Sequence, residues 1–347
     1  MRRALLHAVV FVAVLVAVDR AIFAGAMYLR DHGNLRNGAD LLYDPSWDPS
    51  VVFFGDSRTT HNFDMSVIEA MTGLTAYNFG IDGSGTRQNV LMIDQLLGYH
   101  HHPKVIVLEA DVNSLSNNWG RLDIAPFQAY LATRPAPDAL VAPDNRNLSG
   151  RLVKFGMRWV LRSASIANRL PDLVEHWQLR EQINDVAHET PQTSVCHETP
   201  ESGLLRCIDY HGSKLFVPER PWSVEFKLGG TVDIDADQMA LFERAVALAR
   251  AHGAYLLLEQ TPYYLTDTIY PPDDTAPVEQ FFCELARANP NVLYARLSHL
   301  DGTDHDPALY YDPWHFDAAG ARIMSEATAP LIADLAHGYR PEACILR

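Results

Sequence analysis

The chain is poor in positive charge. It has 347 residues, with 28 Lys and Arg against 43 Asp and Glu, so its formal net charge is −15 when histidine is counted as neutral. A nucleic-acid-binding protein usually presents a basic face, so this balance argues against that class. The sequence also has no repeat period of the kind that builds solenoids or propellers. The length exceeds that of one typical domain, roughly 100–200 residues, and it fits one large α/β domain with an insertion, or two domains.

Motifs for cofactors and metals are missing as well. The sequence has neither a phosphate-binding glycine loop nor a dinucleotide fingerprint, and the spacing of its four cysteines suits no zinc site. The histidine run at 100–102 favours a solvated loop over a metal site. Residues 304–306 lack the glycine and the terminal glutamate of a calcium loop. We therefore expect no metal and no cofactor.

Long apolar runs are confined to the N-terminus. The stretch Ala4–Leu29 is apolar except for His7, Asp19 and Arg20, and as a helix it would span about 39 Å, against about 30 Å for a hydrocarbon core. The arginines before it favour a cytoplasmic N-terminus. We predict that residues 1–30 are an inner-membrane anchor and that 31–347 lie in the periplasm or outside the cell. The alternative is a cleaved signal peptide and a secreted protein.

Export would place the four cysteines in an oxidising compartment. Cys196 and Cys207 could then close a loop of about a dozen residues, although two free buried thiols are an equal alternative. The sequence does not indicate how Cys283 and Cys344 pair.

Short apolar runs alternate with helical patterns from residue 51 onward. This alternation predicts parallel crossover units, and hence a three-layer α/β/α sandwich with a mostly parallel five-stranded sheet. The predicted strands are 51–54, 74–78, 105–110, 254–259 and 291–297, and the predicted helices are 64–71, 86–99, 235–252, 276–288 and 317–337. In such sheets, ligands bind beyond the carboxyl ends of the strands.

A long segment, about residues 114–232, interrupts the alternation. It is rich in Pro, Asn and Arg, and it contains predicted helical pieces at 152–161 and 173–185. It is consistent with a lid, a substrate-binding platform or a packing elaboration. Its tryptophans could stack on sugars, although such residues are more often part of a core.

Two short segments carry the residue types of nucleophilic catalysis. Ser57 follows a buried strand and a glycine, a position that exposes its hydroxyl at the carboxyl edge of the sheet beside backbone N–H groups. Asp312 and His315 lie three residues apart just before the last predicted helix. At that spacing the carboxylate can accept from one imidazole nitrogen while the other faces the serine.

With these residues in place, the chain resembles the SGNH, or GDSL, hydrolase superfamily. Four blocks match in the family's order: 55–57, 78–83, 103–113 and 312–315. The resemblance covers about 51–113 and 235–337, leaves the insertion unmatched, and implies a flavodoxin-like SGNH fold. It also implies Ser57 as nucleophile, His315 as general base and Asp312 as the residue that orients His315.

The resemblance further implies an oxyanion hole made by the N–H groups of Ser57 and Gly83 and the side-chain amide of Asn113. The chain departs from the family's usual pattern at three positions: Arg58 replaces an apolar residue, Asp111 replaces a glycine, and Ser114 stands where aspartate is common. They make Asn113 the least secure assignment, with Asn117 or Asn118 as substitutes.

Two arginines near the strand ends are candidates for binding an anionic substrate. The alternative, which we favour, is that Arg58 and Arg87 form salt bridges to Asp56 or Asp82.

The resemblance narrows the expected function to acyl-ester chemistry. Similar membrane-tethered proteins act on O-acetyl groups of bacterial surface polysaccharides or cell-wall polymers, and some receive the acyl group from a membrane partner. We therefore expect a serine esterase or O-acyltransferase whose partners are an acylated carbohydrate or cell-envelope polymer and, for transfer, a membrane acyl-donor protein. The alternative from another class is a non-catalytic carbohydrate-binding or scaffold component of a polysaccharide export complex.

Overall fold

The chain divides into two compact units, one made of residues 1–43 and 123–185 and the other of 44–122 and 186–347. The computed structural model describes residues 2–32, 41–44, 47–99, 101–116, 137, 140, 192–199, 203–217, 234–340 and 342–346. Both sheets and every predicted site residue belong to the second unit.

The N-terminal segment forms one continuous helix, α1 (Arg2–His32). Among the residues that the structure describes, no helix combines the length and the apolar character that crossing a bilayer requires. The predicted transmembrane helix therefore has no support from the structure.

The central sheet is parallel throughout and has six strands in the order β2-β1-β3-β7-β8-β9. This confirms a mixed α/β fold with a mostly parallel sheet, and it corrects the predicted five strands to six. The additional strand is only three residues long and follows the last helix, so its sequence pattern is too short to detect. The strands are β1 (Val51–Phe54), β2 (Ala76–Asn78), β3 (Val105–Glu109), β7 (Tyr255–Gln260), β8 (Val292–Arg296) and β9 (Cys344–Leu346).

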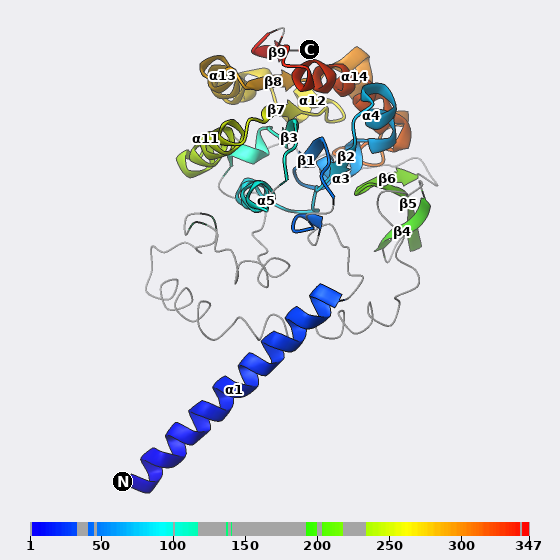
Figure 1. Ribbon diagram of the computed structural model, residues 1–347. Coiled ribbons are helices and arrows are strands. Elements are labelled where there is room, and N and C mark those ends of the chain that lie inside the picture. The colour runs from blue at the N-terminus through cyan, green and yellow to red at the C-terminus, as the bar shows by residue number, and fades with distance from the viewer. Residues whose placement is uncertain are drawn as a thin grey trace. The chain divides into compact units, whose positions relative to one another are not determined.

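Helices cover both faces of this sheet (Figure 1). On one face lie α3 (Ser57–Asn62), α4 (Met65–Thr72) and α14 (Ala318–Ala336), which contact one another. On the other lie α5 (Thr86–Gly98), α11 (Ala236–Ala251) and α13 (Pro272–Ala288). Apart from the edge strand β9, the strands between them are largely buried, as the near-continuous apolar runs predict for a sheet covered on both sides. Short helical turns occur at η1 (Asn113–Leu115), α12 (Thr266–Ile269), η4 (Leu300–His305) and η5 (Pro307–Leu309).

Aspartate caps fix where four of these helices begin. Each caps its helix by accepting from at least one backbone N–H group in the first turn: Asp56 in α3, Asp64 in α4, Asp235 in α11 and Asp317 in α14. A short acceptor side chain at this position satisfies N–H groups that have no partner within the helix. The predicted helices are therefore confirmed to within a few residues at their amino ends, except α13, which begins four residues earlier than predicted.

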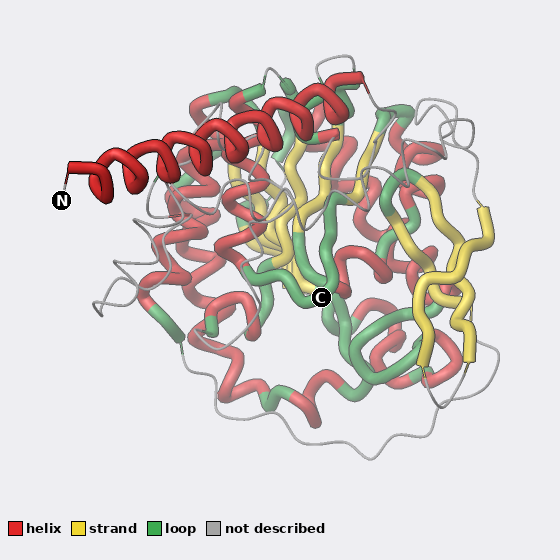
Figure 2. Tube along the Cα trace, turned by 90° about the horizontal axis from the view of Figure 1, so that it is seen from below, coloured by secondary structure: helices red, strands yellow, loops and turns green. Residues whose placement is uncertain are grey.

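The inserted segment contributes a second, antiparallel sheet, which the sequence analysis did not predict. It consists of β4 (Gln192–Thr199), β5 (Gly203–Tyr210) and β6 (Ser213–Val217), and Figure 2 shows it beside the parallel sheet. The predicted helical pieces at 152–161 and 173–185 lie outside the described residues.

The turn between β5 and β6 docks against the edge strand β2. His211 and Gly212 both have positive φ, the geometry of a tight hairpin turn. The carbonyl of His211 accepts from Asn78 N at 2.9 Å. A Cβ on Gly212 would lie 2.0 Å from Asn78 O, so this close approach requires glycine. The hairpin thus covers the edge of the parallel sheet and brings β6 close to α3.

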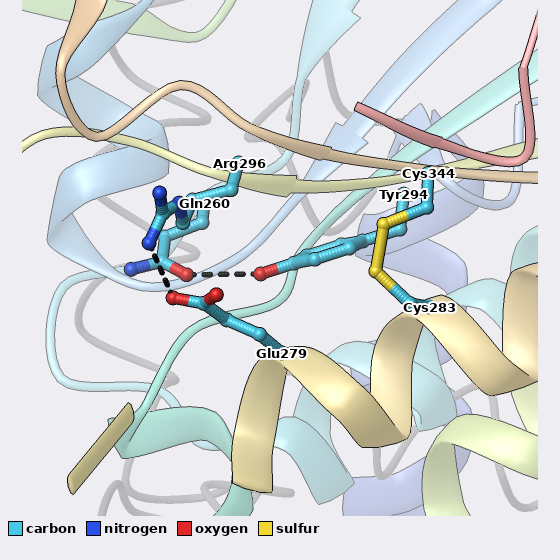
Figure 3. The surroundings of a disulfide bond; sticks show 6 residues. All are labelled: Gln260, Glu279, Cys283, Tyr294, Arg296 and Cys344. Atoms are coloured by element: carbon cyan, nitrogen blue, oxygen red, sulfur yellow. Dashed lines mark hydrogen bonds and ion pairs between the residues drawn. A yellow bond between two sulfur atoms is a disulfide. The ribbon is translucent and has the colours of Figure 1, made fainter. Parts of the chain in front are cut away.

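A disulfide between Cys283 and Cys344 ties β9 to α13 (Figure 3). Its Cα atoms are 5.2 Å apart, and 61 residues separate the two cysteines in sequence. Nearby, Tyr294 donates to Gln260 at 3.0 Å. The side chains of Cys196 and Cys207 lie outside the described residues, although the adjacent strands β4 and β5 carry them. The Cys196–Cys207 pairing therefore stays a prediction.

Candidate active site

Ser57, His315 and Asp312 form one chain of hydrogen bonds. His315 Nε2 lies 2.8 Å from Ser57 Oγ, and His315 Nδ1 lies 2.8 and 2.9 Å from the two carboxylate oxygens of Asp312. Ser57 comes from the turn after β1, whereas the other two residues come from the loop before α14, where His315 is 258 positions away from Ser57. The three residues predicted from the sequence are therefore brought together at the carboxyl edge of the parallel sheet.

The loop around Asp312 holds its carboxylate in place. Asp312 Oδ1 accepts from the backbone N–H groups of Trp314 at 2.8 Å and His315 at 2.9 Å. Burial acts to raise the pKa of Asp312, but the hydrogen bond and charge of His315 and these two N–H donors outweigh it, so the pKa is lowered from 3.8. An ionised carboxylate fixes the Nδ1–H tautomer of His315, which leaves Nε2 able to accept the serine proton.

Two of the three predicted oxyanion donors have no acceptor. Within the described part of the chain, the backbone N–H groups of Ser57 and Gly83 make no hydrogen bond. Gly83 has a φ of +72°, in the left-handed region, and a Cβ built on it would meet no atom within 4 Å. Its turn is bound to the strand before Ser57, because Gly55 O accepts from Ile81 N at 3.1 Å and from Ser84 Oγ at 2.9 Å.

The third predicted donor, Asn113, is part of a hydrogen-bonded cluster with two tyrosines. Its Nδ2 donates to Tyr263 Oη at 3.1 Å, and its Oδ1 accepts from Tyr270 Oη at 2.9 Å. Because the Tyr263 hydroxyl donates its proton to the Asp111 carboxylate, it accepts from the amide, which identifies Nδ2 and leaves its second N–H for a ligand. The suggested substitutes, Asn117 and Asn118, lie outside the described residues.

Arg58 is buried beneath the candidate site instead of facing it. Its side chain is 4% exposed, and its guanidinium contacts Glu109 at 2.6 Å and Asp111 at 2.8 Å. The guanidinium also lies 4.1 Å from the centre of the Tyr263 ring. The salt bridge that we favoured over substrate binding is thus present, but its partners on and after β3 differ from the predicted Asp56 and Asp82.

The buried group formed by Asp56, Arg58, Glu109 and Asp111 contains three acids and one base. In addition to its contact with Arg58, Glu109 accepts hydrogen bonds from Asp56 N at 2.7 Å and from Thr59 Oγ1 at 3.2 Å. Burial, and then the neighbouring Asp56 carboxylate, raise the pKa of Glu109 to about 8, while the Arg58 guanidinium opposes the shift. Glu109 therefore holds the backbone N–H of Asp56 and the side chain of Arg58, the two residues that flank the candidate nucleophile.

The insertion supplies one wall of the site through Phe216 of β6. The Phe216 ring stacks on Tyr311 with centroids 4.3 Å apart and meets the His315 ring edge-on at 5.8 Å. The inserted segment therefore lies directly against His315 of the candidate triad. The tryptophans considered for sugar stacking, Trp119, Trp159, Trp177 and Trp222, lie outside the described residues.

Arg87 lies in the first turn of α5, a few residues after the Gly83 turn, and is half-buried. Its place agrees with the predicted position near the strand ends, and a contact with an anionic substrate stays a prediction.

Sequence reasoning missed Glu109 and Phe216. Glu109 is the last residue of an apolar strand, where a single acid with no partner nearby in sequence gives little signal. Phe216 belongs to the insertion, whose strands were not predicted. The one available signal for Glu109 was the pairing of a buried-strand acid with Arg58, which replaces an apolar residue in the resembled motif.

Comparisons with known proteins add little to this geometry. No protein-family model matches the chain, and no curated protein is significantly similar to it. Among solved structures, the chain is similar to a crystal structure of a Bacteroides fragilis protein provisionally described as an acylhydrolase. The TM-score is 0.40 with 13% identity, covering 87% of this chain and 97% of that one. A likeness this distant carries no argument about function.

Proposed function

We propose that the protein is a serine-dependent enzyme of SGNH type that cleaves or transfers acyl esters. The observation that carries the proposal is the hydrogen-bonded chain from Ser57 Oγ through His315 to Asp312. A nucleophile, a base and a residue that orients the base, each within hydrogen-bond distance of the next, are what acyl transfer through serine requires. The unpartnered N–H groups of Ser57 and Gly83 support the same reaction.

These groups account for each bond and each proton in the reaction. Ser57 Oγ attacks the ester carbonyl carbon while His315 Nε2 takes the hydroxyl proton, and the carbonyl oxygen becomes an oxyanion. The C–O bond to the alcohol then breaks, and His315 returns the proton to the leaving oxygen. The resulting acyl-serine is resolved by a second hydroxyl, of water in an esterase or of a sugar in a transferase, which His315 deprotonates in turn.

The oxyanion would be stabilised by the N–H groups of Ser57 and Gly83 and by the remaining N–H of Asn113. Removing one such donor typically costs about 2.7–4 kcal/mol of barrier. Because Tyr263 and Tyr270 hold the Asn113 amide, this donor would be oriented before the substrate binds.

We further propose that the substrate is an O-acylated polysaccharide or cell-envelope polymer outside the cytoplasm. The Cys283–Cys344 disulfide supports this location, because such bonds persist in oxidising compartments. Tyr311, which is only partly buried and lies in the same loop as His315, supports a ring-shaped substrate, since an aromatic ring can pack against the apolar face of a sugar.

The test incubates the full-length protein with an acetyl-ester reporter, with and without oligosaccharide acceptors, and measures free acetate and acetylated sugar by mass spectrometry. We expect both products to be abolished in the Ser57→Ala and His315→Ala variants while folding is retained. Acetate alone would indicate an esterase, and acetylated sugar a transferase. Wild-type turnover in either variant would refute the serine mechanism.

A further inference from the structure

A second histidine–aspartate pair lies beside the candidate triad. His61 is one helical turn after Ser57 in α3, and its side chain is 4% exposed. Its Nε2 lies 3.3 Å from Asp82 Oδ1, and its Nδ1 is hydrogen-bonded to the backbone carbonyl of Lys214 in β6. Asp82 is the residue before Gly83, and 63% of its side chain is exposed.

These two contacts favour the charged form of the ring. A carbonyl oxygen only accepts, so Nδ1 must carry a proton toward Lys214 O. A neutral ring with that proton would turn the lone pair of Nε2 toward the Asp82 carboxylate, which is repulsive. Only the imidazolium donates to both acceptors.

The remaining neighbours of the ring are consistent with a held cation. Phe216 stacks on His61 with centroids 4.0 Å apart, and the face of an aromatic ring attracts positive charge. The His315 ring meets it edge-on at 5.5 Å. Burial would raise the pKa of Asp82, but the hydrogen bond and charge of His61, and then the charges of Lys214 and His315, lower it, so the carboxylate is ionised.

We infer that His61 is held as an imidazolium and is a positioning residue that joins helix α3 and strand β6 to the turn carrying Gly83. The effect of His61 on catalysis rests on the proposed function, whereas the charge state of His61 does not. The other described links between this turn and the segment around Ser57 are hydrogen bonds of neutral groups: Gly55 O accepts from Ile81 N and Ser84 Oγ, and Asn78 Nδ2 donates to Thr59 O at 2.6 Å. The His61–Asp82 link alone among them depends on protonation.

The charge of His61 is tested by NMR of the full-length protein labelled with ¹⁵N-histidine, with the His61 signals identified by their loss in His61→Gln. At pH 7 we expect both ring nitrogens of His61 to have imidazolium shifts. In Asp82→Asn, which changes an exposed side chain and should fold, we expect a neutral ring at the same pH. A neutral His61 in the folded wild-type protein at pH 7 would overturn the inference.

The positioning role is tested by steady-state kinetics on an ester reporter. Removing an oxyanion donor outright costs about 10²- to 10³-fold in kcat, so loosening the Gly83 turn in Asp82→Asn should lower kcat about 10-fold or more with KM nearly unchanged. In the wild type, a fall in kcat should coincide with the loss of the His61 charge that NMR records. In Asp82→Asn, the two changes should move together to lower pH.

The matched control is His101→Gln. His101 is also buried and lies 3.7 Å from an aspartate carboxylate, Asp48, but it precedes β3 at the amino ends of the strands. Its kcat and pH profile should match the wild type. An unchanged kcat and pH profile in Asp82→Asn would refute the positioning role. No Ser57-dependent cleavage in the wild type would instead refute the proposed function, and the NMR result would still decide the charge.

Discussion

At the scale of single residues, the candidate site contains some residues that a sequence motif predicts and others that no motif predicts. Ser57, Asp312 and His315 were predictable, because a serine after a buried strand and an Asp-x-x-His before the last helix each have a local pattern. Glu109 and His61 were not, because their partners lie far away in sequence or depend on how the chain folds around β6. Arg58 was expected in a salt bridge, but its actual partners follow from the neighbouring strand.

The Asp312 carboxylate should be needed for catalysis more than for folding. In Asp312→Asn the amide would present a donor to His315 or favour the wrong tautomer, and by analogy with serine hydrolases kcat should fall by about 10⁴-fold. Kinetics with a soluble ester, alongside circular dichroism to confirm folding, measures this. A loss below about ten-fold would contradict the orienting role.

The same variant gives a pH test of stability. Because the folded state lowers the pKa of Asp312 from 3.8, its ionised form stabilises the fold above about pH 4, and this contribution is lost as the pH falls through the folded value. The stability difference between wild type and Asp312→Asn should therefore shrink in acid, as measured by urea unfolding at pH 3 and pH 6.

The Arg58 guanidinium should be structural. Replacing it by Met leaves Asp56, Glu109 and Asp111 together without a cation, and breaking a buried ion pair from one side costs about 3–5 kcal/mol. Urea unfolding measures the loss, with Arg87→Met as a half-buried control that should lose far less. Equal losses of unfolding free energy in the two variants would contradict a stabilising role for the buried Arg58 ion pairs.

At the scale of elements, the alternation of strands and helices was predictable because each buried parallel strand is a short apolar run and each helix has a clear period or cap. β9 was too short for that reasoning. The strands β4 to β6 were hidden in a segment with no apolar periodicity. No local sequence pattern therefore predicts that Phe216 lies beside His315.

The contact between β7 and α14 contains a second buried acid with a testable pH effect. Burial raises the pKa of Glu259 to about 8, while Thr328 Oγ1 donates to its carboxyl and opposes the shift. From about pH 4.5 to about 8 the unfolded chain loses this proton before the folded one, so stability should fall with rising pH, by up to about 1.4 kcal/mol per pH unit.

Glu259→Gln should remove that slope and become relatively more stable as the pH rises. Urea unfolding at pH 5.5 and pH 7.5 measures it, and Glu284→Gln, the same change at an exposed position of α13, serves as the control. Parallel pH dependence of the wild type and Glu259→Gln would contradict a buried, protonated Glu259.

At the scale of the whole molecule, the disulfide makes the free energy of unfolding depend on the redox conditions of the compartment. The Cys283–Cys344 bond closes a loop of 61 residues, which corresponds to about 4 kcal/mol in the chain-entropy model. The double variant Cys283→Ser with Cys344→Ser should lose about 2–4 kcal/mol of unfolding free energy. Reductant should destabilise the wild type more than the variant, and equal sensitivity to reductant would argue against the bond.

The central claim is that Ser57 is a nucleophile activated by His315, and covalent capture tests it most directly. The full-length protein would be treated with a phosphonate ester that reacts with activated serines, digested, and its peptides analysed by mass spectrometry. The account predicts one modified site, Ser57, with labelling abolished in Ser57→Ala and strongly slowed in His315→Ala. A folded wild-type protein that stays unlabelled at Ser57, or one labelled equally fast without His315, would contradict the account.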